Sequence, residues 1–141
     1  DLEAPCGETT LGEALLTPTR IYVRPLLAAL SAHPGAIHAL AHITGGGLPE
    51  NLPRVLPEGL GARVDSGRWS QPPVFDWIRE QGRVEQAEMF RTFNCGIGMV
   101  VAVAADEAEA VAATLREAGE TVTAIGELTA AGEDAPRVTI A

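Results

Sequence analysis

The sequence predicts an α+β fold with α/β character, in which a mixed β-sheet has helices packed mainly on one face. Strand-like and helix-like segments alternate along the chain, and proline and glycine separate them. Hydrophobic residues make up 46% of the 141 residues, so the chain carries enough apolar side chains to bury a core. This length suits one compact domain and is too short for two ordinary ones.

Threonine, proline and glycine mark the element boundaries in the first half of the chain. Threonine is a favoured N-cap, so Thr9 or Thr10 is expected to start the first helix. Because the residue before proline avoids the helical region, Thr17 ends that helix, and Pro34-Gly35 ends the next one. We expect an exposed entry segment over 1–8, helices over 10–16, 25–33 and 49–56, an extended stretch over 21–23, and strands over 37–43 and 62–65.

In the second half, the clearest signal is the helix that follows Asp106. Asp106 and Glu109 have the spacing of a capping box, apolar residues then recur at helical spacing, and Gly119 is the expected residue past the C-terminus. We expect further helices over 73–81 and 84–93, and strands over 97–103, 122–128 and 138–140. The stretch from 97 to 128 is then a βαβ unit, whose crossover should be right-handed.

Charge and composition argue against several functional classes. The net charge is −9 and all ten basic residues are arginines, which disfavours a nucleic-acid surface. No apolar run approaches the roughly 20 residues that a membrane span needs, and no signal-peptide pattern opens the chain. Cys6 and Cys95 form no CxxC pair, as in a reduced protein. We expect a cytoplasmic location with neither a nucleic-acid nor a membrane partner.

The most informative segment is HITGGGLPEN, residues 42–51. Three consecutive glycines separate an apolar strand from a short helix, a geometry that gathers backbone N–H groups and favours an anion such as phosphate. The alternative is a tight connection in which the polar side chains are ordinary caps. We expect Gly46→Val to block ligand binding at little cost to the fold. The expected ligand contacts are Thr44, Gly45, Gly46, Gly47 and Asn51.

Two other segments gather polar residues that a core does not need. Arg20, in the turn TPTR, offers a planar fork of donors suited to phosphate or carboxylate, or is simply a solvated arginine. Arg91 and Asn94 precede the glycines of RTFNCGIGM, and both can point into a cleft. The alternative there is a helix C-cap with Asn94 or Gly96 in the left-handed conformation.

The histidines and Cys95 are weaker candidates. His38 and His42 lie four residues apart without a neighbouring Cys, Asp or Glu, so no metal site is expected. His42 is the stronger functional candidate because it adjoins the glycine loop, although a histidine bonded to a backbone carbonyl is an equal alternative. Cys95 has no local histidine to activate it, which favours a small buried residue over a nucleophile. No catalytic residue is assigned.

Three segments in this order carry a resemblance to a known family. They are PTRIYV at 18–23, HITGGGLPENLPRVLP at 42–57 and EMFRTFNCGIGMV at 88–100, with IGEL beyond them at 125–128. Over nearly its whole length the chain resembles the C-terminal half of aminoimidazole ribonucleotide synthetase, the phosphoribosylformylglycinamidine cyclo-ligase family of the PurM-like superfamily. The resemblance implies that residues 9–141 are one C-terminal domain and that residues 1–8 enter it from a missing N-terminal domain.

The resemblance also implies a function. Members of the family are ligases of purine biosynthesis that use ATP to close formylglycinamidine ribonucleotide into aminoimidazole ribonucleotide, ADP and phosphate. ATP and Mg²⁺ are expected mostly on the missing N-terminal domain, so none is expected in this chain, which should be inactive by itself. Expected partners are the phosphorylated ribonucleotide substrate, the N-terminal domain and a second copy in a full-length homodimer.

For individual residues, the resemblance implies that Arg20 and Arg91 supply positive charge at a cleft. It also implies that His42 and Asn94 orient the substrate or support the loop. The alternatives are another ATP-dependent enzyme of the superfamily, such as a kinase, a stand-alone anion-binding or small-molecule-binding module, and a pure assembly domain. The pairing of HITGGG with FNCGIGM favours the cyclo-ligase over the kinase.

Overall fold

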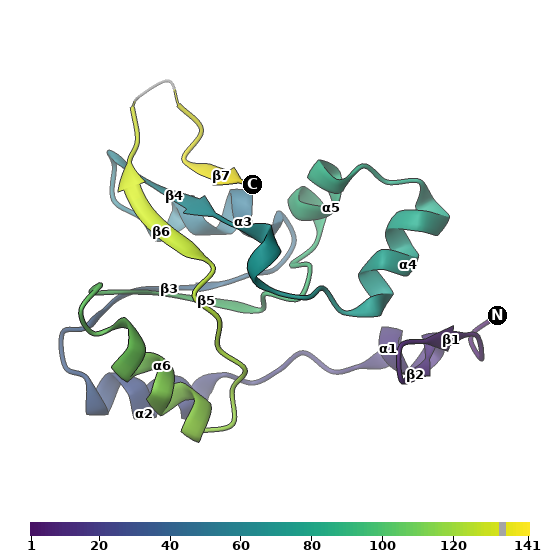
Figure 1. Cartoon of the computed structure of the whole chain (residues 1–141), viewed down its shortest axis with the longest axis horizontal. Helices are drawn as coiled ribbons and strands as arrows, with labels where there is room; N and C mark the ends of the chain where they lie inside the picture. The colour runs from purple at the N-terminus through teal and green to yellow at the C-terminus, as the bar shows by residue number, and fades with distance from the viewer. Residues whose placement is uncertain (133–134) are drawn as a thin grey trace.

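Helices and strands alternate along the chain, and the predicted α+β class with mixed strand pairing is confirmed (Figure 1). The structure is a computed structural model that describes residues 1–132 and 135–141. Within these ranges the strands are divided among three small sheets, with the orders β1-β2, β3-β5 and β6-β4-β7. No helix in the described ranges combines the length and the apolar character needed to cross a membrane.

The centre of the molecule is an antiparallel ladder of β3 (Ile37–His42) and β5 (Met99–Val103). The register places His42 opposite Met99. Successive residues of β5 enter different cores, Val100 on one face and Val101 on the other. Because both faces are covered, these strands read as nearly continuous apolar runs rather than as alternating ones.

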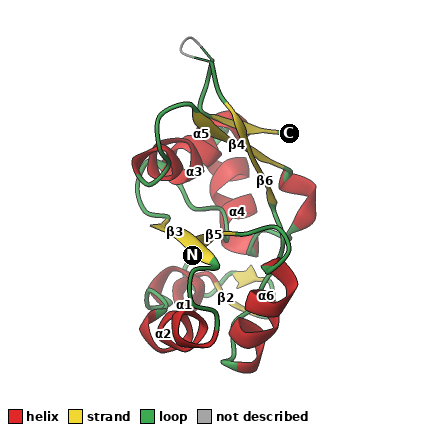
Figure 2. Cartoon of the chain, turned by 90° about the vertical axis from the view of Figure 1, so that its left-hand side faces the viewer, coloured by secondary structure: helices red, strands yellow, loops and turns green. Residues whose placement is uncertain are grey.

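Two helices cover one face of this ladder, as Figure 2 shows. They are α2 (Val23–Ala32) and α6 (Ala108–Glu117). Ala29 of α2, which is fully buried, packs with Val111 and Leu115 of α6. The predicted extended stretch over 21–23 is wrong at its end, because Tyr22 is the N-cap of α2, with φ of −92° and ψ of 0°, and Val23 is already helical.

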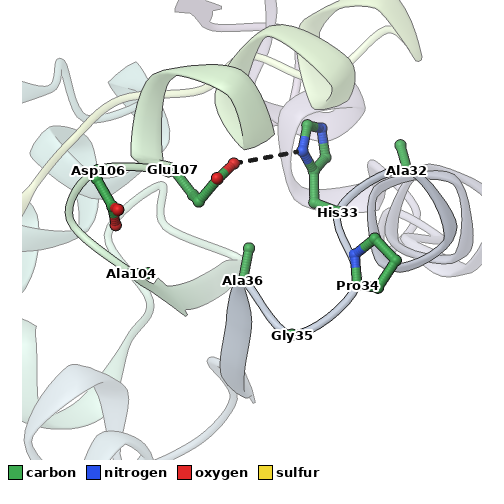
Figure 3. Close-up of a pocket in the computed structure, with 8 residues that line it drawn as sticks. All are labelled: Ala32, His33, Pro34, Gly35, Ala36, Ala104, Asp106 and Glu107. Atoms are coloured by element: carbon green, nitrogen blue, oxygen red, sulfur yellow. Dashed lines mark ion pairs between the residues drawn. The ribbon is translucent and has the colours of Figure 1, made fainter.

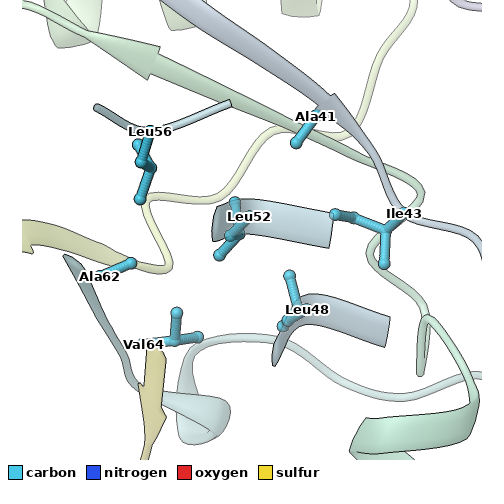
Figure 4. Close-up of a cluster of buried hydrophobic side chains, with 7 residues drawn as sticks. All are labelled: Ala41, Ile43, Leu48, Leu52, Leu56, Ala62 and Val64. Carbon is cyan, nitrogen blue, oxygen red and sulfur yellow. The ribbon is translucent and has the colours of Figure 1, made fainter. Parts of the chain in front are cut away.

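The opposite face packs on α3 (Gly47–Asn51), the 3₁₀ turn η1 (Leu52–Arg54) and β4 (Leu60–Val64). The helix predicted over 49–56 is thus a short α-helix that tightens into a 3₁₀ turn containing Pro53, which cannot donate to an α-helical ladder. The buried side chains of this core, drawn in Figure 4, are Ala41, Ile43, Leu48, Leu52, Leu56, Ala62 and Val64.

The βαβ prediction for residues 97–128 is wrong. In the three-stranded sheet, β4 pairs antiparallel with β6 (Gly126–Ala130) and parallel with β7 (Val138–Ile140). Since β5 belongs to the other sheet, no crossover joins two parallel strands there. The residues predicted to begin the strand instead connect the two cores, with Val122 in the α2–α6 core and Ile125 in the core of α3 and β4.

The ends of α6 agree only in part with the sequence signals. The N-cap is Glu107 rather than Asp106, and no side-chain hydrogen bond caps this end. The predicted C-terminal glycine is confirmed, because Gly119 follows the C-cap with φ of 92°. A capping box does form at α1 (Leu11–Leu16), where the Thr10 hydroxyl and the Glu13 side chain bond each other's backbone N–H groups.

Two helices and the N-terminal segment complete the fold. Helices α4 (Pro73–Gly82) and α5 (Gln86–Thr92) follow the 3₁₀ turn η2 (Ser66–Arg68), and α5 buries Met89 and Phe90. The hairpin of β1 (Pro5–Cys6) and β2 (Thr9–Thr10) lies beside α4. Residues 1–8 are mostly exposed, as predicted for the entry segment, but the Cys6 side chain is buried.

One arginine has a structural role that the sequence does not signal. The Arg137 guanidinium donates to four backbone carbonyls, those of Pro53, Leu56, Pro57 and Leu60, at 2.7–3.1 Å. It therefore joins η1 and the turn after it to the start of β7, and it supplies these carbonyls with a hydrogen-bond donor.

Candidate functional site

The glycine loop lies where β3 ends and α3 begins. Ile43, which is 2% exposed, anchors the loop by donating its N–H to the Gly98 carbonyl at 2.9 Å. Gly46 has φ of 96° and Gly47 has φ of 56°, a left-handed pair that turns the chain directly into α3. The two positions need glycine because L-residues with side chains rarely adopt such angles.

The three glycines have different physical reasons for lacking a side chain. A Cβ on Gly47 would lie 1.8 Å from the Phe90 carbonyl oxygen, so this glycine lets α3 approach α5. A Cβ on Gly46 would lie 2.8 Å from the Cβ of Glu50. Only Gly45 borders open space, with no atom within 4 Å of its Cβ position. The expectation that Gly46→Val costs the fold little is therefore wrong.

Asn51 holds the loop from inside the protein. It is 5% exposed, and its side-chain amide donates to the carbonyls of Gly47 at 2.8 Å, Gly45 at 3.3 Å and Thr44 at 3.4 Å. Its Oδ1 accepts from Arg54 at 3.3 Å, and the Thr44 hydroxyl lies 3.5 Å from the same atom. Asn51 thus supports the loop, whereas the sequence suggested a direct contact with a ligand.

Because carbonyl groups of the glycine loop point inward to Asn51, the N–H groups of the loop remain for other partners. The Gly47 N–H donates to the Thr44 carbonyl at 3.0 Å. Among the described residues, the N–H groups of Gly45 and Gly46 have no hydrogen-bond acceptor, and Gly45 is exposed. Of the three glycines predicted to donate a backbone N–H to a ligand, Gly45 and Gly46 therefore keep that group free, and Gly47 does not.

The two candidate arginines are each paired with a carboxylate. Arg20 donates to Glu120 and to the Gly119 carbonyl, both at 2.7 Å, at the C-terminal end of α6. Arg91 makes a bidentate pair with Glu88, one helical turn earlier, at 2.8 and 2.6 Å. The hydrogen bonds to Glu88 raise the pKa of Arg91. Their positive charges are therefore largely balanced, and they do not converge on one group.

His42 lies beside Tyr22, a residue that is not among the predicted site residues. The Tyr22 ring lies edge-on to the His42 ring, with centroids 6.1 Å apart. A Cβ on Gly98 would lie 1.9 Å from the Tyr22 hydroxyl, so this glycine makes room for the tyrosine. Burial, followed by the Glu120 carboxylate, raises the pKa of Tyr22. Tyr22 was visible in PTRIYV, but nothing in the sequence placed it beside the loop.

The turn at Asn94 is structural in character. The Asn94 side chain accepts from the Gly96 N–H at 3.0 Å, and Cys95 and Gly96 have φ of 48° and 98°. This is close to the left-handed C-cap that the sequence left open. Cys95 is fully buried, its Sγ lies 3.5 Å from the Met89 carbonyl, and burial raises its pKa to about 11. These features confirm a buried small residue.

Two surface hollows lie away from the glycine loop. One, shown in Figure 3, lies at the ends of α2 and β5 beside His33, whose Nε2 is 2.8 Å from the Thr114 hydroxyl and whose Nδ1 is 3.8 Å from Glu107. The other is lined by Arg20, Ile21 and Glu120, among others. The described residues contain no group of three His, Cys, Asp or Glu side chains placed to hold a metal ion.

Comparison with known proteins gives one family. The model of the family described as "AIR synthase related protein, C-terminal domain" matches residues 1–139. A curated relative from Nitrosococcus oceani, named phosphoribosylformylglycinamidine cyclo-ligase, is 53% identical over 137 residues. The match covers 97% of this chain and 38% of the relative, so the chain spans well under half the length of the relative.

Proposed function

The chain belongs to the C-terminal domain family of AIR synthase related proteins, and from this premise we propose that it serves as the C-terminal domain of a phosphoribosylformylglycinamidine cyclo-ligase. The 53% identity to a protein of this name, across 97% of the chain, is the observation that carries the proposal. The complete cytoplasmic enzyme, a homodimer, would use ATP to convert formylglycinamidine ribonucleotide to aminoimidazole ribonucleotide, ADP and phosphate.

In this proposal the glycine loop contacts the phosphorylated ribonucleotide. Three features support it: the inward carbonyls held by Asn51, the N–H groups of Gly45 and Gly46 without protein acceptors, and the open space beside Gly45. Backbone N–H groups that converge at a turn form a concavity suited to anions. His42 and Tyr22 would border the substrate. Arg20 and Arg91 would contribute positive charge only by sharing or exchanging their carboxylate partners.

ATP and Mg²⁺ would be bound by the rest of the polypeptide. Magnesium bound with nucleotide phosphates takes one or two carboxylates from the protein. Among the described residues, Glu88 and Glu120 are already held by Arg91 and Arg20, and no group of three potential metal ligands occurs. The proposal therefore assigns the metal–nucleotide centre to the rest of the polypeptide, and residues 1–141 alone would be inactive.

An ATP-dependent ring-closure assay tests the proposal. The complete polypeptide should form aminoimidazole ribonucleotide, ADP and phosphate in equal amounts, and residues 1–141 alone should form none. Turnover by the chain alone would contradict the division of the site. Phosphorylation of a different acceptor, with no ring closure, would instead favour another ATP-dependent member of the superfamily.

A pair of glycine variants tests the loop within the complete polypeptide. Gly45→Val places a branched side chain beside the free N–H groups, and KM for the ribonucleotide should rise about tenfold or more, as for the loss of one charge-assisted hydrogen bond. Gly132→Val is the matched control, because this exposed glycine also has no atom within 4 Å of its Cβ position. An unchanged KM for Gly45→Val would exclude the loop from substrate binding.

A further inference from the structure

Helix α2 presents an uncovered apolar stripe to solvent. Six of the ten large hydrophobic side chains that are exposed in the described residues fall between positions 15 and 30. Four of them form what we call the outer stripe: Ile21, Val23, Leu27 and Leu30, with exposed fractions of 80%, 59%, 58% and 40%. Positions 23, 27 and 30 share one face of the helix because they follow its i, i+4, i+7 spacing.

The stripe is a second apolar face on a helix whose first face is already buried. Pro25 and Ala29 of α2 are buried, and Ala29 packs against α6. Arg24 is the only charged residue between Val23 and Ala32. A helix at the surface of a folded domain normally carries charged residues opposite its buried face, and one that is apolar on both faces is typically covered on both.

We propose that the outer stripe is the docking surface for the remainder of the same polypeptide, an inference that rests on the proposed function. The chain corresponds to 38% of the length of its relative, so a member of this family has further chain available to cover the stripe. The exposed side chains of the stripe are apolar, so the covering segment has an apolar face.

The size of the outer stripe favours this occupant over a second copy. A stable interface between separate proteins uses about 20–30 residues on each side, far more than the outer stripe provides, whereas domains joined in one chain need less area and no bimolecular association.

Thiol labelling of the complete polypeptide tests the coverage of the stripe. Leu30→Cys and Leu128→Cys are matched, because the two leucines are 40% and 43% exposed here, and Ala28→Cys is an exposed position on the same helix outside the stripe. The native Cys6 and Cys95 are buried. We expect Leu30→Cys to react at least about tenfold more slowly than both controls. Equal rates would overturn the proposal.

A photoreactive residue at position 27 identifies the occupant. The expected product is a cross-link within one molecule to a segment outside residues 1–141. A cross-link between two molecules, a failure to cross-link, or a reading frame that encodes nothing beyond residues 1–141 would each overturn the docking surface.

The ring-closure assay on the same variants separates the two proposals. Absence of ring closure in a polypeptide that cross-links internally would overturn the proposed function and leave the surface intact. Normal ring closure together with rapid labelling of Leu30→Cys would overturn the proposed docking surface and leave the proposed function intact.

Discussion

Replacing Gly47 by alanine should destabilise the chain strongly, although it adds only one methyl group. The added Cβ would lie 1.8 Å from the Phe90 carbonyl oxygen and 2.8 Å from that of Phe93. Carbon–oxygen contacts of this kind need roughly 3.4 Å or more, so the α5 backbone must retreat by about 1.5 Å. That movement would disturb the packing of Met89 and Phe90, which are 0% and 8% exposed.

The magnitude follows from two separate penalties. Overpacking a tight contact costs about 1–3 kcal/mol, and a left-handed backbone costs a residue with a side chain about 1–2 kcal/mol. The backbone penalty applies because Gly47 has φ of 56°. We expect Gly47→Ala to lower the free energy of unfolding by about 2–5 kcal/mol.

The adjacent Gly45→Ala is the matched control, because its Cβ would meet no atom within 4 Å. It should change the free energy of unfolding by less than about 0.5 kcal/mol. Urea unfolding followed by tryptophan fluorescence measures both variants, since the Trp69 ring lies 6.3 Å from the Phe90 ring and senses α5. Equal stabilities of the two variants would refute the assignment of Gly47 to helix packing.

Three further predictions concern buried polar groups. Arg137→Met should lower the free energy of unfolding by about 3 kcal/mol or more, because it removes the donor to four carbonyls; a urea midpoint equal to that of the wild type would contradict this. Asn51→Asp keeps the shape of the side chain but points a carboxylate at the Gly47 carbonyl. Calorimetry near neutral pH should therefore show that the free energy of unfolding falls by about 2 kcal/mol or more. The pKa of Cys95 is raised from 9.0 to about 11, so its contribution to stability is complete below about pH 9 and is lost as the pH rises through about 11. In urea titrations at increasing pH, Cys95→Ala should remove this part of the loss in the free energy of unfolding. An unchanged loss would exclude Cys95 as its source.

Segments whose signals are local were predictable from the sequence. The capping threonine Thr10, the C-terminal Gly119 and the proline-bounded helix α4 depend on interactions within a few residues, and the structure has all three. The βαβ prediction failed because the sequence indicates that β5 and β6 are strands without indicating which strands they pair with. Pairing depends on contacts between segments far apart in the chain, and β3 and β4 supplied those partners.

The same distinction applies to the candidate site. The run of three glycines indicated an unusual turn, but only the packing against α5 showed that Gly47 serves the fold while Gly45 faces open space. The position of Tyr22 beside His42 and the pairing of Arg20 with Glu120 join residues 20 and 100 positions apart.

By itself, the sequence determined the class of fold, the position of the glycine turn and, through the resemblance of its motifs, the family, because these signals are properties of the chain alone. The tertiary structure decided which backbone amides stay free, which arginines are neutralised and which apolar face remains uncovered. Those properties depend on the distances between elements that only folding brings together.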